Sequence, residues 1–177
     1  MPNIILADPP ESIDSRGTVF LPIAATAPAP PVEPPVDQVA TFYRLLVADQ
    51  RQQRGSLERC ADLEAAAAAR AYGLSHGDPW SHVDAHGVTP NEYCRAAGCK
   101  LPDSYAQKGN NVESLVAGAG DASVMLEALT RSPKHADHIF GRNDFFRQQD
   151  KFGIACCERL DSEYRWYWCV LIGVCRE

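Results

Sequence analysis

Three short segments of the chain carry the side chains with the most obvious chemistry. These segments are residues 81–87, 111–113 and 132–135. They contribute His82, Glu113 and His135, and imidazole nitrogens and carboxylate oxygens are ligands that zinc-class divalent cations use. We therefore expect a metal-binding set if the fold brings the three segments together. The alternative is a hydrogen-bonded polar cluster that only holds loops in place.

Other kinds of site find little support in the sequence. No Cys-x-x-Cys pair occurs, so a zinc ribbon or a thioredoxin-type site is not expected. The chain has no phosphate-binding glycine motif, and none of its serines lies in a nucleophile-elbow context. No separate general base accompanies the candidate metal set, which weakens the case for hydrolysis.

The charge and hydropathy of the chain exclude further classes. The net charge is -6 and no run of five basic residues exists, so we expect neither nucleic-acid binding nor a polybasic membrane patch. No apolar run approaches the ~18 residues that a membrane span needs. The first residues lack Lys and Arg, so a classical signal peptide is not expected either.

The seven cysteines are many for a chain that stays in a reducing cytosol, and their odd number leaves at least one thiol unpaired within the chain. Cys94 and Cys99 are close enough in sequence to close a small loop. Cys156 or Cys157 could face Cys169 across a hairpin. Equally, most of the cysteines could be small buried hydrophobes.

Residues 1–38 differ from the rest, because nine of the thirteen prolines lie in the first 35 positions. Proline-rich sequence favours an extended conformation, so we expect an N-terminal arm followed by one domain over residues 39–177. Phe20, Leu21 and Ile23 are the apolar side chains through which the arm would bind other protein subunits. A linker, or an arm packed on its own domain, is the alternative.

Helical patterns occupy most of the domain up to residue 140. We expect helices over residues 39–55, 56–73, 89–97, 121–131 and 132–140. Thr89, Pro90 and Glu92 form the sequence signature of a capping box with proline at the first position, which makes Glu92 a cap rather than an acid catalyst. Asp121 is expected to cap the next helix. Asn110 or Asn111 should cap a turn that carries Glu113.

The end of the domain is predicted to be a hairpin. Residues 152–158 and 164–174 are typical of strands, with a turn near Asp161 and Ser162. The second strand is apolar on both alternating faces, so both of its faces should be covered. Helices first and strands last predict a sheet between helical layers.

Several of these features, taken in order, resemble one known family, the CAP (SCP/PR-1-like) superfamily in its bacterial form. The matching segments are Ser81-His82, Gly87, Thr89-Pro90, Ala96-Ala97-Gly98, Glu113 with Gly118, Ser132-Pro133 with His135, Phe152-Gly153-Ile154 and Tyr167-Trp168. The resemblance covers about residues 40–174. It implies an α+β fold, a three-layer α-β-α sandwich with a short antiparallel sheet, in which His82, Glu113 and His135 share one cleft.

The chain also departs from the family pattern. The family's Gly-Glu-Asn segment is Val112-Glu113-Ser114 here, Lys134 replaces a glycine, and Ala136 replaces the usual arginine. The second glutamate of many animal members would fall near Ser132. The metal site is therefore a triad at best. His138, one helical turn after His135, is expected at the surface.

Two functions fit these expectations. The first is a non-catalytic binding or structural module, such as a phage capsid or tail component of a virion, tethered to other subunits by the N-terminal arm. The second is a secreted or envelope CAP protein that binds a divalent metal such as zinc and a cell-wall or peptide ligand, with hydrolysis as a further option. Both place the protein in a virion or outside the cell.

Overall fold

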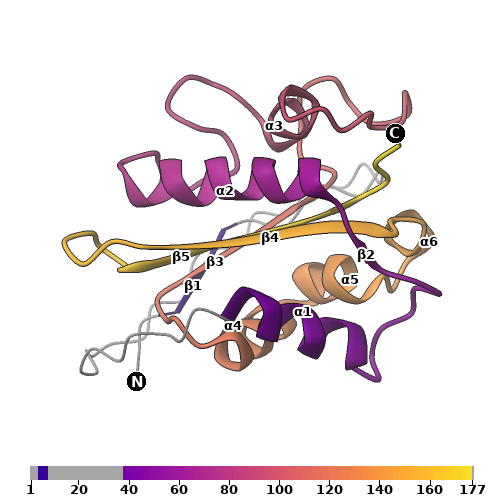
Figure 1. Cartoon of the computed structure of the whole chain (residues 1–177), viewed down its shortest axis with the longest axis horizontal. Helices are drawn as coiled ribbons and strands as arrows, with labels where there is room; N and C mark the ends of the chain where they lie inside the picture. Colours follow the sequence, from indigo (N-terminus) through magenta and orange to yellow (C-terminus); the bar gives the residue numbers. More distant parts are fainter. Residues whose placement is uncertain (1–3, 8–37, 177) are drawn as a thin grey trace.

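The structure is a computed structural model that describes residues 4–7 and 38–176. Its elements, in chain order, are β1 (Ile5–Leu6), α1 (Gln38–Ala48), β2 (Glu58–Arg59), α2 (Ala61–Ser75), α3 (Pro90–Ala96), β3 (Glu113–Ala117), α4 (Ala122–Thr130), α5 (Pro133–Phe140), α6 (Asp144–Arg147), β4 (Lys151–Glu158) and β5 (Trp166–Gly173). Helices cover both faces of the sheet (Figure 1). The expected α+β class with three layers is confirmed.

The five strands form one sheet in the order β1-β3-β5-β4-β2. β4 and β5 make the predicted hairpin, paired from Lys151 opposite Gly173 to Glu158 opposite Trp166. β5 lies at the centre, and all eight of its residues are buried, which accounts for its apolar sequence. The expected antiparallel pairing is extended at one edge by β2, which pairs in parallel with β4.

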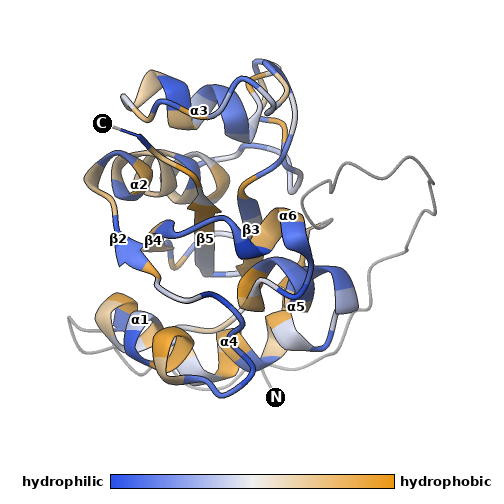
Figure 2. Ribbon diagram, turned by 90° about the vertical axis from the view of Figure 1, so that its right-hand side faces the viewer, coloured by the Kyte–Doolittle hydropathy of each residue, from blue (hydrophilic) through white to orange (hydrophobic). Residues whose placement is uncertain are grey.

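Two hydrophobic cores lie on opposite faces of the sheet. α1, α4 and α5 lie on one face, and α2 covers the other with α3 packed beyond it, as the turned view in Figure 2 shows. Successive residues of β5 alternate between the two cores, so that Trp168 and Val170 face α1 and α4 while Cys169 and Leu171 face α2. Gly153 of β4 lies directly against the backbone of α2, so a Cβ at this position would overlap Leu63.

Helix boundaries follow the capping signals closely in the second half of the domain. The Thr89–Glu92 capping box is present at the start of α3, and the Asp121 side chain accepts hydrogen bonds from the backbone of Ser123 and Val124. α5 begins at Pro133 as predicted.

The first two helices differ from prediction. α1 ends at Ala48 rather than near Gly55, and α2 begins at Ala61 rather than at Ser56. The intervening Glu58–Arg59 pairs with the free edge of β4 instead, an interaction that helical periodicity does not reveal. At its other end, α2 continues past Gly73 to Ser75.

The start of the chain contributes to the sheet. Ile5 pairs with Ala117 and Leu6 with Val116, so β1 is an edge strand beside β3. The proposed partner-binding residues Phe20, Leu21 and Ile23 lie outside the described residues, as does most of the proline-rich arm. Among the described helices, none has the length and apolar character of a membrane span.

The disulfide pairings that the sequence offered do not form, and the alternative of buried free thiols holds for Cys94 and Cys169. The structure joins Cys99 to Cys175, whereas Cys94 is a free, buried thiol. α3 turns Cys94 into the core, and a bridge between Lys100 and Arg176 brings the end of the chain to Cys99 instead.

The hairpin cysteines are also free, and the strand register gives the reason. Cys169 lies opposite Ala155, while Cys156 and Cys157 lie opposite Trp168 and Tyr167. Cys156 belongs to the other face of the sheet, because adjacent strand residues alternate. Cys157 shares the face of Cys169 but is offset along the strand, so neither cysteine is directly across from it.

Candidate functional site

Glu113 opens strand β3 and is completely buried. The Asn110 side chain holds this start of the strand, because its Oδ1 accepts hydrogen bonds from the backbone nitrogens of Val112 (3.2 Å) and Glu113 (2.8 Å). Its Nδ2 donates to the Glu113 carbonyl oxygen at 3.1 Å. The predicted asparagine turn therefore exists, but Glu113 lies at the first position of the strand that follows it.

Three donors converge on the Glu113 carboxylate. His82 Nδ1 lies 2.8 Å from Oε1. Arg70 Nε donates to Oε2 at 3.1 Å, and the thiol of Cys169 reaches the same oxygen at 3.3 Å. Both carboxylate oxygens are thus occupied by groups of the protein itself.

Arg70, which lies on α2, is the part of this network that sequence reasoning missed. Its side chain has no exposed surface, and Nη2 donates to the Ser81 carbonyl oxygen at 2.7 Å. Nη1 lies 3.6 Å from the Asp78 carboxylate, and the guanidinium carbon stands 5.3 Å from the centre of the Tyr93 ring. Arg70 thereby fixes the loop that presents His82.

A signal for Arg70 does exist in the sequence. Apart from Ser75 at its end, the buried face of α2 is otherwise apolar and consists of Leu63, Ala66, Ala67, Ala71 and Leu74. An arginine at helical spacing within such an apolar stripe must have a buried partner, because an unpaired charge in the interior is very costly.

The charges in the network stabilise one another. Burial alone raises the pKa of Glu113, but the His82 hydrogen bond and the Arg70 charge outweigh it, so that this pKa is lowered. Burial opposes the charge of Arg70, yet the nearby Glu113 carboxylate raises the arginine pKa overall. Burial, followed by the Glu113 charge, raises the pKa of the Cys169 thiol well above its ordinary value. Glu113 and Arg70 are therefore ionised and Cys169 is protonated near neutral pH.

The two candidate histidines each have a nitrogen with no hydrogen-bond partner among the described residues. His82 uses Nδ1 for Glu113, and its Nε2 is buried without a partner. Both ring nitrogens of His135, on α5, are buried and make no bond that meets ordinary geometry. Burial lowers the pKa of His135 to about 3, the His82 ring adds to this effect, and the backbone of Ala7 counteracts it only in part.

His138, expected at the surface, is instead completely buried. Its Nδ1 lies 2.7 Å from Ser114 Oγ, and its Nε2 lies 3.4 Å from the Ile172 carbonyl oxygen. The structural reason is that α5 packs on β3, which directs the His138 side chain onto the sheet. With both nitrogens engaged, His138 is a structural residue.

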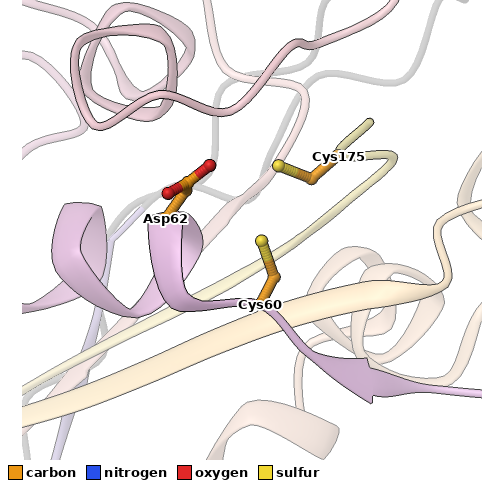
Figure 3. Close-up of side chains that lie close together, drawn as sticks. All are labelled: Cys60, Asp62 and Cys175. Carbon is orange, nitrogen blue, oxygen red and sulfur yellow. The ribbon is translucent and has the colours of Figure 1, made fainter. Parts of the chain in front are cut away.

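The geometry changes how the metal-ligand prediction must be understood. Glu113 is held by three protein donors, so its role toward His82 is that of an orienting carboxylate rather than a free ligand. The tightest group of three possible ligands in the described part of the chain lies elsewhere, at Cys60, Asp62 and Cys175 (Figure 3). Of the predicted ligand set, His82 and His135 remain available to a cation.

Comparison with known proteins gives information about the fold. No protein-family model matches the chain, and a search of curated proteins finds no match. Among solved structures, an outer surface protein from Borrelia burgdorferi is similar, with a TM-score of 0.55 and 20% sequence identity. The similarity covers 79% of this chain and 93% of the other. At this identity it supports the same fold.

Proposed function

We propose that the protein is a non-catalytic, CAP-like binding module in which His82 and His135 bind a divalent cation of the zinc class. The observation that carries this proposal is that both imidazoles, half-buried His82 and buried His135, have buried nitrogens without a partner. Buried polar atoms without a partner are rare in folded proteins, and each needs a reason. A cation that accepts nitrogen ligands supplies that reason for both side chains.

The protonation states support cation binding. His135 stays neutral at physiological pH because burial lowers its pKa to about 3. His82 directs Nδ1 to the Glu113 carboxylate, which leaves the Nε2 lone pair available. Metal-binding histidines commonly donate their other nitrogen to a carboxylate in this way. A bound cation would present an open coordination position to a ligand that supplies oxygen or nitrogen.

A binding role is favoured over hydrolysis by the state of Glu113. A general base must accept a proton from water, but Glu113 has a lowered pKa and both oxygens occupied. His138 makes two hydrogen bonds of its own and is likewise unsuited to this role. In the described part of the chain, no other carboxylate forms a hydrogen bond with His82 or His135.

We place this module outside the cell or on its surface. The similar fold of an outer surface protein and the Cys99–Cys175 disulfide support this setting, because structural disulfides persist in oxidising environments. Attachment to an assembly such as a virion through Phe20, Leu21 and Ile23 remains a prediction, since those residues lie outside the described part of the chain.

Isothermal titration with Zn²⁺ tests the proposal. The disulfide-bonded protein should bind one equivalent, and His82→Ala or His135→Ala should each weaken binding by at least about tenfold, since even an orienting residue contributes that much. Glu113→Gln should weaken zinc binding less than either histidine substitution does, because His82 would lose its orienting partner but keep its ligand atom Nε2.

His86→Ala is the matched control. His86 belongs to the same loop as His82 but is exposed, so its removal should leave zinc binding unchanged. Equal losses in His82→Ala and His86→Ala would show adventitious surface binding and contradict the proposal, as would the absence of binding in the unaltered protein.

A further inference from the structure

A second group of potential ligands shares no residue with the imidazole pair. Cys60 immediately precedes α2, Asp62 lies in its first turn, and Cys175 follows β5. One ligand atom from each residue lies within 4.8 Å of the other two. Figure 3 shows the three side chains pointing toward one another from separate segments.

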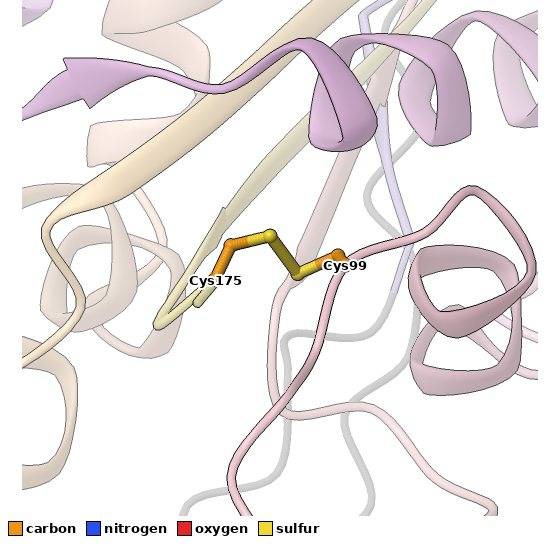
Figure 4. Close-up of a disulfide and its surroundings, with 2 residues drawn as sticks. All are labelled: Cys99 and Cys175. Carbon is orange, nitrogen blue, oxygen red and sulfur yellow. A yellow bond between two sulfur atoms is a disulfide. The ribbon is translucent and has the colours of Figure 1, made fainter. Parts of the chain in front are cut away.

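The backbone holds this group together without help from the disulfide. The Cys60 nitrogen donates to the Phe152 carbonyl oxygen at 2.9 Å, which fixes Cys60 to strand β4. The Arg176 nitrogen donates to the Lys100 carbonyl oxygen at 3.3 Å. That bridge sets Cys175 beside Cys99, with their Cα atoms 5.2 Å apart (Figure 4). The backbone positions of Cys60 and Cys175 therefore do not depend on the disulfide.

The surroundings leave room for the carboxylate and favour negative ligands. Gly98 lies against Asp62, and a Cβ at that position would come within 3.2 Å of Asp62 Oδ2. Cys60 and Asp62 stand at the N-terminus of the 15-residue helix α2, where the backbone dipoles favour negative charge. Lys151 is also close: its pKa is raised mainly by Glu58, and Cys60 is among the smaller contributors.

We propose that, once the Cys99–Cys175 disulfide is reduced, Cys60, Cys175 and Asp62 bind one zinc-class cation. A thiol or phosphine reductant supplies the two electrons that cleave the S–S bond and is itself oxidised. Each thiol then releases its proton as it binds the metal. Thiolates together with a carboxylate match the ligand preference of zinc.

The other buried cysteines near this group would not compete. Burial raises the pKa of Cys94 above its ordinary value, with Glu113 adding to the effect. The pKa of Cys169 is likewise raised, and its thiol donates to Glu113. Both therefore remain protonated thiols, whereas zinc binds the thiolate.

The test uses the full chain carrying His82→Ala, so that the imidazole pair does not contribute and the two proposals can fail separately. The protein is reduced with a phosphine and titrated with Co²⁺ without oxygen. We expect one equivalent to bind with sulfur-to-cobalt charge-transfer absorption. Adding Cys60→Ala or Cys175→Ala should weaken binding by at least about tenfold, because each removes a direct ligand. Asp62→Asn should weaken it while retaining the absorption.

Cys156→Ala serves as the control, because Cys156 is a free thiol on the opposite face of the sheet. It should leave cobalt binding unchanged, and the disulfide-bonded protein should show no charge-transfer band. Absence of the band from the reduced chain, or undiminished binding in Cys60→Ala, would overturn the proposal.

If the cysteine variants do not fold, alkylation of the reduced His82→Ala chain provides an independent readout. Zn²⁺ should slow the labelling of Cys60 and Cys175 but not that of Cys157, a half-exposed free thiol near the far end of β4. Labelling rates that do not change with Zn²⁺ would overturn the proposal equally.

Discussion

Replacing Glu113 by glutamine should cost about 3 kcal/mol of unfolding free energy, the lower end of the range for breaking a buried ion pair. Glutamine keeps the size of the side chain but removes its charge, so Arg70 loses its buried counter-ion. It also offers one acceptor oxygen and an NH₂ group to three converging donors, and at least one donor must face the NH₂. Asp78, 3.6 Å from Arg70, limits the loss to the lower end.

Urea unfolding, followed by tryptophan fluorescence, measures this cost. Glu127→Gln is the matched control on the exposed face of α4, where a weak ion pair with Arg51 should contribute nothing measurable. In an Arg70→Met background, Glu113→Gln should cost less than in the unaltered protein, because the two side chains are coupled. A loss below about 1 kcal/mol for Glu113→Gln alone, typical of an exposed pair, would refute the buried network.

Two further predictions concern stability. His135 has a folded pKa of about 3, and an unfolded histidine titrates near 6.5. As pH falls between these values the unfolded chain gains a proton that folded His135 does not, so His135 alone should lower stability by up to about 1.4 kcal/mol per pH unit. Buried His138, whose pKa burial also lowers, adds to this slope. His135→Phe should reduce the pH dependence of the unfolding free energy, measured by urea titrations at several pH values. An unchanged pH dependence would contradict the buried, neutral state of His135. Gly153→Ala should cost about 3 kcal/mol or prevent folding, because its Cβ overlaps Leu63. Gly55→Ala should not be destabilising, because a Cβ at that position meets nothing within 4 Å. Equal melting temperatures for the Gly153→Ala and Gly55→Ala variants would contradict this packing.

Much of the fold could be predicted because it is encoded locally. The Thr89–Glu92 capping box, the Asp121 cap and the apolar run of β5 each follow from neighbouring residues, and each occurs where expected. The short strand β2 could not be foreseen in this way. Two polar residues have no strand signal of their own, and Glu58–Arg59 becomes a strand only because β4 offers a free edge.

The candidate site was predicted in part for the same reason. Residue type and the resemblance to the CAP family predict that His82 and Glu113 lie together, and the structure brings them within hydrogen-bonding distance. Their partner Arg70 has a sequence signal, its place in the apolar stripe of α2, but only the packing of α2 shows which groups it bonds. The disulfide shows the same limit, since Cys99 and Cys175 are 76 residues apart and meet only through a backbone bridge at the end of the chain.

The most direct test of the central claim is the ¹⁵N chemical shift of the histidine rings during a zinc titration of the disulfide-bonded protein. Before zinc, His82 should carry its proton on Nδ1, toward Glu113. Zinc should then shift His82 Nε2 and one nitrogen of His135 together, while exposed His86 stays unchanged. A proton on His82 Nε2 before titration, or rings of His82 and His135 that do not respond, would contradict the account.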